Sequence, residues 1–447
     1  LENFCDNAPT DILFESSGDD LLAAALIREN KISVFENDGF FFDSAFAKFL
    51  SSPGEKRTED LKFLCRWAKT HSTFVNNCVM DTGLAGYILN VSGDDYSTEH
   101  LSALYNSKRF NIKNDLPEHA DILKRAEVFP FLCDALRSEL TKNGEGDILD
   151  NIEIPLASVL AEMELSGFRI DPDGIREFGD MLGGRIDEKE KLIYELAGEE
   201  FNILSPKQLG VILFEKLGLP AKKKTKSGYS TSADVLEELA VDYPVVADIL
   251  EYRMVQKLKS TYCDGLVACI AEDGRIHSTL NQKETRTGRI SSTEPNLQNI
   301  PVRKPLGSEL RKFFVAKEGY TLIDADYSQI ELRVLAHMAD DANMIKAFES
   351  GEDIHRVTAS QVFKVPLSEV TPVMRSRSKA VNFGIVYGIG AFSLAKDIGV
   401  TRAEAQEYIA GYLENFSGVD NYMKNVIEEA KANVREAVKP LGKIASG

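Results

Sequence analysis

The sequence predicts a multidomain α/β protein in which helix dominates. A chain of 447 residues exceeds the size of one ordinary domain, so roughly two or three domains are expected. Residues 1 to about 145 mix short apolar runs, such as residues 12–14 and 32–35, which predict strands, with helical segments. From residue 152 to about residue 269, the apolar spacing is that of long amphipathic helices. The first region is therefore predicted to contain a sheet, and the second to be helical.

Turn and capping residues predict where several elements begin and end. The Lys-Asn-Gly-Glu-Gly stretch at residues 142–146 predicts a linker after the α/β domain. Ser205 and Gln208 predict a helix start with a capping box, and a proline stands at the first helical position. Thr401 and Glu404 predict a second capped helix. The last third of the chain alternates strand-like and helical pieces.

The net charge of −18 is unevenly distributed along the chain. Residues 1–200 hold 39 acidic and 20 basic side chains, a net charge of −19, whereas residues 201–447 hold 31 acidic and 32 basic ones, a net charge of +1. Between residues 283 and 312, seven basic side chains stand against three acidic ones. Because phosphate contacts depend on the local field, this charge distribution permits DNA binding in the second part of the chain without proving it.

Composition disfavours two classes of protein. No window reaches the roughly 18 unbroken apolar residues that a membrane helix needs. The six cysteines form no Cys-x-x-Cys pair and no cluster with histidine, which disfavours a zinc site or a disulfide framework. A reducing, intracellular compartment fits this usage.

An acidic strand end and a nearby helix carry the predicted chemistry. Residues 320–327 predict a buried strand that ends in acidic residues, followed by a turn into a helix. Asp326 at the end of a rigid strand is suited to Mg²⁺, which prefers hard oxygen ligands. An acid at a strand end is more often a loop or cap residue, so Asp326 indicates a metal site only together with other functional residues.

Four residues at a spacing of four form the second part of this chemistry. At 3.6 residues per turn each step drifts by only about 40°, so all four share one helix face. The cationic end of that face suits a triphosphate, and the aromatic end suits stacking on a base. The alternative is an amphipathic helix whose aromatic residues face the core. The four residues are Arg375, Lys379, Phe383 and Tyr387.

These segments resemble motifs of the family A DNA polymerases of bacteria. Residues 326–333 look like motif A, and residues 375–388 resemble motif B, the nucleotide-binding helix of the fingers. Residues 287–303 resemble the family's primer–template-binding segment, and residues 353–356 a further fingers motif. The resemblance continues in one uninterrupted order from about residue 150 to residue 430, so chance is not a serious competitor.

The resemblance implies a right-hand polymerase fold preceded by an RNase H-like 3′–5′ exonuclease-type domain. We expect the exonuclease-like domain at residues 1–145, the thumb at 146–280, a partial palm at 281–340 and the fingers at 341–447. Two Mg²⁺ ions as cofactors, and primer–template DNA and dNTPs as partners, come with this fold. A cytoplasmic monomer that works in DNA replication and repair, away from any membrane, is expected.

The resemblance also implies roles for single residues. Asp326 would be one of two carboxylates that bind the metals, with the Tyr327 carbonyl assisting. Arg375, His355 and Lys379 would hold the triphosphate, and Lys379 would donate the proton.

The remaining implied roles concern the nucleoside and the DNA. Phe383 would stack on the incoming nucleoside, and Tyr387 would pack where the new base pair forms. Glu331 would close the space at the sugar 2′ position, and Gln329 belongs to the same dNTP-binding set. The residues implied to contact primer–template DNA, where sequence is poorly readable, are Arg289, Asn296, Gln298 and Arg303.

Two departures from the family pattern qualify these roles. No His-Asp-Glu tripeptide, the family's motif C with its second metal carboxylate, occurs in the chain, and the sequence also departs after Asn433. We therefore expect a C-terminally truncated fragment that polymerises poorly or not at all alone. In the N-terminal region, Leu13 stands where the family exonuclease has the aspartate of Asp-x-Glu before Glu15. Asp81 lies in a segment that resembles the second exonuclease segment, but no Tyr-x-x-x-Asp occurs around Tyr105. An inactive exonuclease domain, kept as a scaffold, is expected.

Three functions stay open. The first is a template-directed DNA polymerase. The second is a single-subunit RNA polymerase, which shares part of motifs A and B, although Glu331, Phe383 and residues 295–303 favour the DNA enzyme. The third is a non-catalytic primer–template-binding fragment, because motif C is missing.

Overall fold

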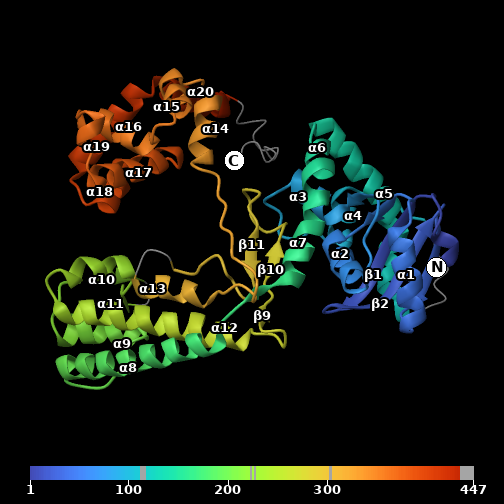
Figure 1. Cartoon of the computed structure of the whole chain (residues 1–447), viewed down its shortest axis with the longest axis horizontal. Helices are drawn as coiled ribbons and strands as arrows, with labels where there is room; N and C mark the ends of the chain where they lie inside the picture. Colours follow the sequence, from blue (N-terminus) through green and yellow to red (C-terminus); the bar gives the residue numbers. More distant parts are fainter. Residues whose placement is uncertain (111–116, 222–223, 226–227, 302–304, 433–447) are drawn as a thin grey trace. The chain divides into compact units, whose positions relative to one another are not determined.

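The computed structural model describes residues 1–110, 117–221, 224–225, 228–301 and 305–432 (Figure 1). The chain divides into two compact units, of which the first comprises Leu1–Leu322 and the second begins at Ile323. Each helix in the described ranges is too short or too polar to cross a lipid bilayer.

The first unit opens with a five-stranded mixed sheet. Its strand order is β3-β2-β1-β4-β5, with β1, β2 and β3 antiparallel and β4 parallel to both β1 and β5. The predicted strands at residues 12–14 and 32–35 are confirmed as parts of β1 and β3. The strands are β1 (Thr10–Ser17), β2 (Asp20–Arg28), β3 (Lys31–Glu36), β4 (Lys56–Thr58) and β5 (Cys78–Asp81).

Helices cover both faces of this sheet. Because successive side chains of a strand point to opposite faces, Ile12 packs with α1 and α2, whereas Leu13 packs with α3 and α5. The sheet between two helical layers confirms the predicted α/β domain, and its arrangement is consistent with an exonuclease-like domain (Figure 1). The helices are α1 (Phe40–Ser51), α2 (Leu61–Thr70), α3 (Thr82–Leu89), α4 (Thr98–Leu104) and α5 (Ala120–Asn143).

The predicted linker at residues 142–146 is a tight corner between helices. Helix α5 ends at Asn143, and the left-handed conformation of the next residue, Gly144 (φ 73°), closes the last turn; α6 (Gly146–Ile148) begins two residues after Gly144. A wider π-type turn at Leu149–Glu153 joins α6 to α7 (Ile154–Ser166). Helix α7 packs on α2 of the N-terminal domain.

The middle of the chain forms a helical bundle, as predicted. Its core includes Leu182, Leu236 and Ile249, all fully buried. The capping box at Ser205 is only half formed, because the Gln208 side chain accepts from the backbone of Asn202 instead. The bundle contains α8 (Pro172–Ala197), α9 (Pro206–Gly210), α10 (Ala233–Ala240), α11 (Pro244–Lys257), α12 (Gly265–Ala268) and, further along the chain, α13 (Pro305–Glu309).

Three short antiparallel ladders complete the first unit. The pairs are β6 (Phe168–Arg169) with β9 (Arg275–Ile276), β7 (Lys224–Thr225) with β8 (Gly228–Tyr229), and β10 (Thr279–Asn281) with β11 (Ser291–Thr293).

The second unit is helical in its described part. Leu332, Met344, Tyr412 and Phe416 are fully buried in its core. The predicted capping box of Thr401 and Glu404 is confirmed, with both reciprocal bonds present. Its helices are α14 (Ile330–Met338), α15 (Ala342–Glu349), α16 (Ile354–Phe363), α17 (Pro372–Val386), α18 (Ala391–Ile398), α19 (Arg402–Asn415) and α20 (Ser417–Ala432).

The predicted buried strand at residues 320–327 is wrong. This segment has no regular secondary structure, and Ile323 is 89% exposed. A strand needs a neighbour to pair its backbone groups, and no described strand lies beside this one. The expected turn into a helix is confirmed, because Gln329 in the left-handed conformation (φ 55°) precedes α14.

Candidate nucleotide site and nucleic-acid interface

Helix α17 presents its predicted face to a cavity. Thr371 caps its first turn, and Val381 and Ile385 are buried in the core of the unit. On the other side of the helix, Arg375, Lys379 and Phe383 line a cavity of about 400 Å³. The alternative arrangement, with the aromatic residue in the core, is therefore not adopted by Phe383, which is half-buried.

Tyr387 ends α17 and connects it to α14. Its hydroxyl donates to the Glu331 carboxylate, whose oxygens lie 2.7 and 2.8 Å away. Glu331 itself lines the cavity, whereas Tyr387 does not line it and is connected to it through this hydrogen bond. Their hydrogen bond fixes the direction of the carboxylate beside Phe383.

His355 is a buried hydrogen-bond donor of this site. Burial lowers the pKa of its imidazole to about 4; Asp353 opposes this shift, whereas Arg375 and Lys379 add to it. The imidazole is thus neutral at pH 7. The Asn382 side-chain amide lies 2.8 Å from Nδ1 of His355 and donates to it, which places the remaining proton on Nε2.

Two residues that position this cluster were absent from the predicted set. Oδ1 of Asn382 accepts from Thr358, which leaves its amide group to donate to His355. Asp353 accepts from Nε of Arg375 at 2.6 Å and so orients the guanidinium. A buried asparagine between apolar neighbours in α17 was the available sequence signal for the first of these.

Asp326 and Tyr327 line the same cavity, together with Gln329. The Asp326 carboxylate is exposed and makes no hydrogen bond or ion pair within the described part of the chain. The cavity therefore combines two cationic side chains, a neutral imidazole donor, an aromatic ring and an open carboxylate. Such a set suits an anionic ligand with an aromatic base, with hard oxygen available for a divalent cation.

Comparison with known proteins gives the family. The model of DNA polymerase family A matches residues 173–442, which is more than half of the chain and extends past Asn433. The chain belongs to DNA polymerase family A. DNA polymerase I of Bacillus subtilis is 41% identical over 95% of this chain and 51% of its own length. DNA polymerase I of Geobacillus stearothermophilus is 42% identical over 92% of this chain and 49% of its own.

A solved polymerase structure is also similar. The POL domain of Pol1 from M. smegmatis, in complex with DNA primer–template and dNTP, has a TM-score of 0.84 and 34% identity. The match covers 95% of this chain and 75% of that one. The chain spans about half the length of the curated relatives it matches.

The predicted DNA contacts of this family A chain belong to the first unit. Arg289, Asn296 and Gln298 are exposed, and Arg303 lies outside the described residues. Gln298 donates from Nε2 to the carbonyl of Ile290 at 2.7 Å, and its own N–H is held by the Asn296 side chain. These bonds tie the segment after β11 to the loop before it.

The Asp81 carboxylate of the exonuclease-like domain is enclosed by backbone donors. Its oxygens accept from the N–H groups of Leu84 at 2.9 Å and Leu61 at 2.7 Å, so it caps α3 and holds the start of α2. Burial raises the pKa of this carboxyl to about 6, although Lys283 opposes the shift. Asp81 acts here as a structural cap.

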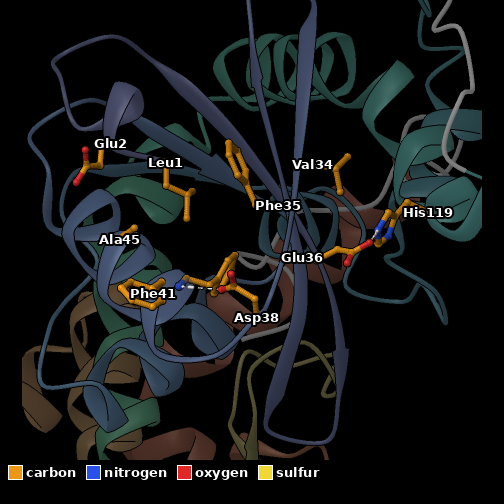
Figure 2. Close-up of a pocket in the computed structure, with 10 residues that line it drawn as sticks. Leu1, Glu2, Val34, Phe35, Glu36, Asp38, Phe41, Ala45 and His119 are labelled. Carbon is orange, nitrogen blue, oxygen red and sulfur yellow. Dashed lines mark hydrogen bonds and ion pairs between the residues drawn. The ribbon is translucent and has the colours of Figure 1, made fainter.

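Glu15 of the same domain is bonded to a histidine. Oε2 of Glu15 lies 3.1 Å from Nδ1 of His119, and Nε2 of His119 lies 3.1 Å from Glu36. Figure 2 shows His119 and Glu36 at a cavity of about 530 Å³. Burial lowers the pKa of His119, but its bonds to Glu36 and Glu15 outweigh this and raise it overall.

Among the described residues, the side chains that could together hold a metal ion do not include Asp81 or Asp326. The single group of three within 4.8 Å consists of Glu36, Glu118 and His119, and both glutamates are exposed.

Proposed function

We propose that this chain is the part of a DNA polymerase that binds primer–template DNA and dNTP and adds dNMPs to a primer 3′-hydroxyl. DNA replication and repair in the cytoplasm is the proposed setting, with the chain as a monomer. The observation that supports this most is the single cavity shared by Asp326, His355, Arg375, Lys379 and Phe383.

The donors of the cavity suit a triphosphate. Arg375 and Lys379 supply positive charge, and His355 donates from Nε2 without a charge of its own. In this proposal, Lys379 also gives a proton to the leaving pyrophosphate. Positioning and charge stabilisation supply most of the catalysis in phosphoryl transfer.

The nucleoside is bound by the other end of the face. Phe383 stacks on the base, and Tyr387 packs beside the new base pair. Glu331, oriented by Tyr387, closes the space at the sugar 2′ position and so disfavours ribonucleotides. Exclusion of ribonucleotides by Glu331 would distinguish a DNA polymerase from an RNA polymerase. A comparison of dNTP with rNTP incorporation tests this role.

Mg²⁺ fits one side of this site. The Asp326 carboxylate is open, and the Tyr327 carbonyl would assist it. When bound, two such ions activate the primer hydroxyl and stabilise the leaving group. Glu331, the other carboxylate at the cavity, is bonded to Tyr387, so the second metal ligand has to come from elsewhere.

Extension of a labelled primer–template with Mg²⁺ and four dNTPs tests the proposal. Any extension, which should be weak because motif C is missing, is expected to vanish in Asp326→Ala and to persist in Asp397→Ala, an exposed carboxylate of the second unit away from the cavity. DNA binding without extension would favour the alternative, a non-catalytic primer–template-binding fragment. If the chain shows no binding and no extension, both functions are overturned.

A further inference from the structure

We propose that the N-terminal domain holds the basic hairpin in its DNA-binding conformation, with Tyr87 as a positioning residue. The basic hairpin is defined as residues 279–293, which comprise β10, β11 and the loop that carries Arg286 and Arg289. The inference rests on the proposed function, since it assigns the N-terminal domain a part in primer–template binding.

Tyr87 of α3 closes the turn of the basic hairpin. Its side chain is fully buried, and its hydroxyl donates to the Thr285 carbonyl at 2.7 Å. Thr285 in turn donates from its hydroxyl to the carbonyl of Arg289 at 2.7 Å. One hydroxyl of the N-terminal domain therefore fixes the backbone on which Arg286 and Arg289 stand.

The base of the basic hairpin is held in the same way. The Leu280 N–H donates to Glu164 at 2.7 Å, and its carbonyl accepts from Nζ of Lys62 at 2.7 Å. Lys62 also pairs with Glu164 at 2.5 Å. Gln282 is buried and donates to the carbonyl of Glu153 at 2.8 Å. Lys62 belongs to α2 of the N-terminal domain and Glu164 to α7, which packs on α2, whereas Glu153 ends the π-type turn before α7.

Lys283 adds an electrostatic attraction, because it lines cavities together with Asp60, Asp81 and Glu59. Burial lowers the pKa of its ammonium, but Asp81, Asp60 and Glu59 outweigh this and raise it overall. Gly83 leaves the space for this approach, because a side chain there would come within 2.7 Å of Nζ. Lys283 is thus directed into the N-terminal domain, whereas Arg286 and Arg289 are exposed.

Holding the loop before DNA arrives lowers the cost of binding. A loop that must order itself on binding loses conformational entropy, and that loss weakens the complex. A domain that lacks the exonuclease motif still contributes in this way.

Tyr87→Phe tests the role, because it removes one hydroxyl and keeps the ring. The matched control is Tyr105→Phe, a half-buried tyrosine that packs on the same domain's core. The Kd for a fluorescent primer–template is measured by anisotropy over a salt series. Tyr87→Phe is expected to bind about 3- to 10-fold more weakly. The slope of log K against log salt is expected to become less steep by about 0.9, which corresponds to the loss of one phosphate contact. The control is expected to match the wild type.

Two further measurements separate positioning from general destabilisation. Arg289→Ala is expected to reproduce the reduced slope, and the double variant to bind no more weakly than Arg289→Ala alone. Amides 285–289 of the free Tyr87→Phe protein are expected to exchange faster. An unchanged slope in Tyr87→Phe, with or without a lower Tm, would overturn the inference while leaving the proposed function intact. A wild-type chain that binds no primer–template would overturn the proposed function and this inference with it.

Discussion

Asp81 and Asp326 both stood out in the sequence as acids of a nuclease or polymerase motif, yet they have opposite surroundings. Asp81 is 2% exposed and has two backbone N–H groups on its oxygens. Asp326 is exposed and unpaired within the described ranges. A carboxylate that already satisfies backbone donors has to give them up to bind a cation, whereas an open one does not. Motif resemblance alone did not separate these two states.

The largest expected difference between the two aspartates is in stability. Asp81→Ala should lower the free energy of unfolding of the N-terminal domain by about 2–3 kcal/mol, because it removes a helix cap and leaves two buried donors unpaired. Trp67, the sole tryptophan, lies in the core of that domain, so its fluorescence in urea reports the change.

Asp326→Ala should change the free energy of unfolding by less than about 0.5 kcal/mol. Circular dichroism measures this change, because no tryptophan lies in the second unit. Equal losses for the two variants would contradict the comparison.

His355 extends the comparison to pH, because it is a buried group in the otherwise open site. Its pKa is lowered from 6.5 to about 4 in the folded chain. Between these values the unfolded state binds a proton that the folded state does not, so folding stability should fall as the pH falls from 6.5 to 4. The loss should be on the order of 2 kcal/mol.

Thermal melts followed by circular dichroism at several pH values measure this loss. His355→Gln removes the titrating group and should show a smaller decline over the same interval. An identical decline in both proteins would mean that other groups carry the pH dependence.

A substitution of Lys379 tests whether the open site around Asp326 binds a nucleotide. Lys379→Ala should weaken dNTP binding about 10- to 100-fold, because a charged hydrogen bond to a phosphate is lost. Lys424→Ala, which removes an exposed lysine paired with Asp420 in the same unit, is the matched control and should bind as the wild type does. Titration with a fluorescent dNTP gives both values, and a Lys379→Ala affinity equal to the control would remove Lys379 from the site.

Local spacing predicted much of this architecture, and contacts between distant segments were beyond it. The shared face of Arg375, Lys379 and Phe383 follows from helical periodicity alone. The strand at residues 320–327 failed because burial of an alternating segment depends on a neighbouring strand. The bond from Tyr87 to Thr285 joins residues 198 apart in sequence, so no local pattern announces it.

The smallest expected effect concerns nuclease activity in the N-terminal domain. The bond of Glu15 to His119, the caps made by Asp81 and the buried Leu13 leave neither Glu15 nor Asp81, the two acids of the nuclease motifs, free of hydrogen bonds. Incubation of labelled single-stranded DNA with Mg²⁺ or Mn²⁺ should therefore give no 3′–5′ digestion, and Glu15→Gln and Asp81→Ala should not differ from the wild type. Metal-dependent digestion that disappears in Asp81→Ala would show that the cap opens to bind metal, and the distinction between an enclosed and an open aspartate would no longer hold.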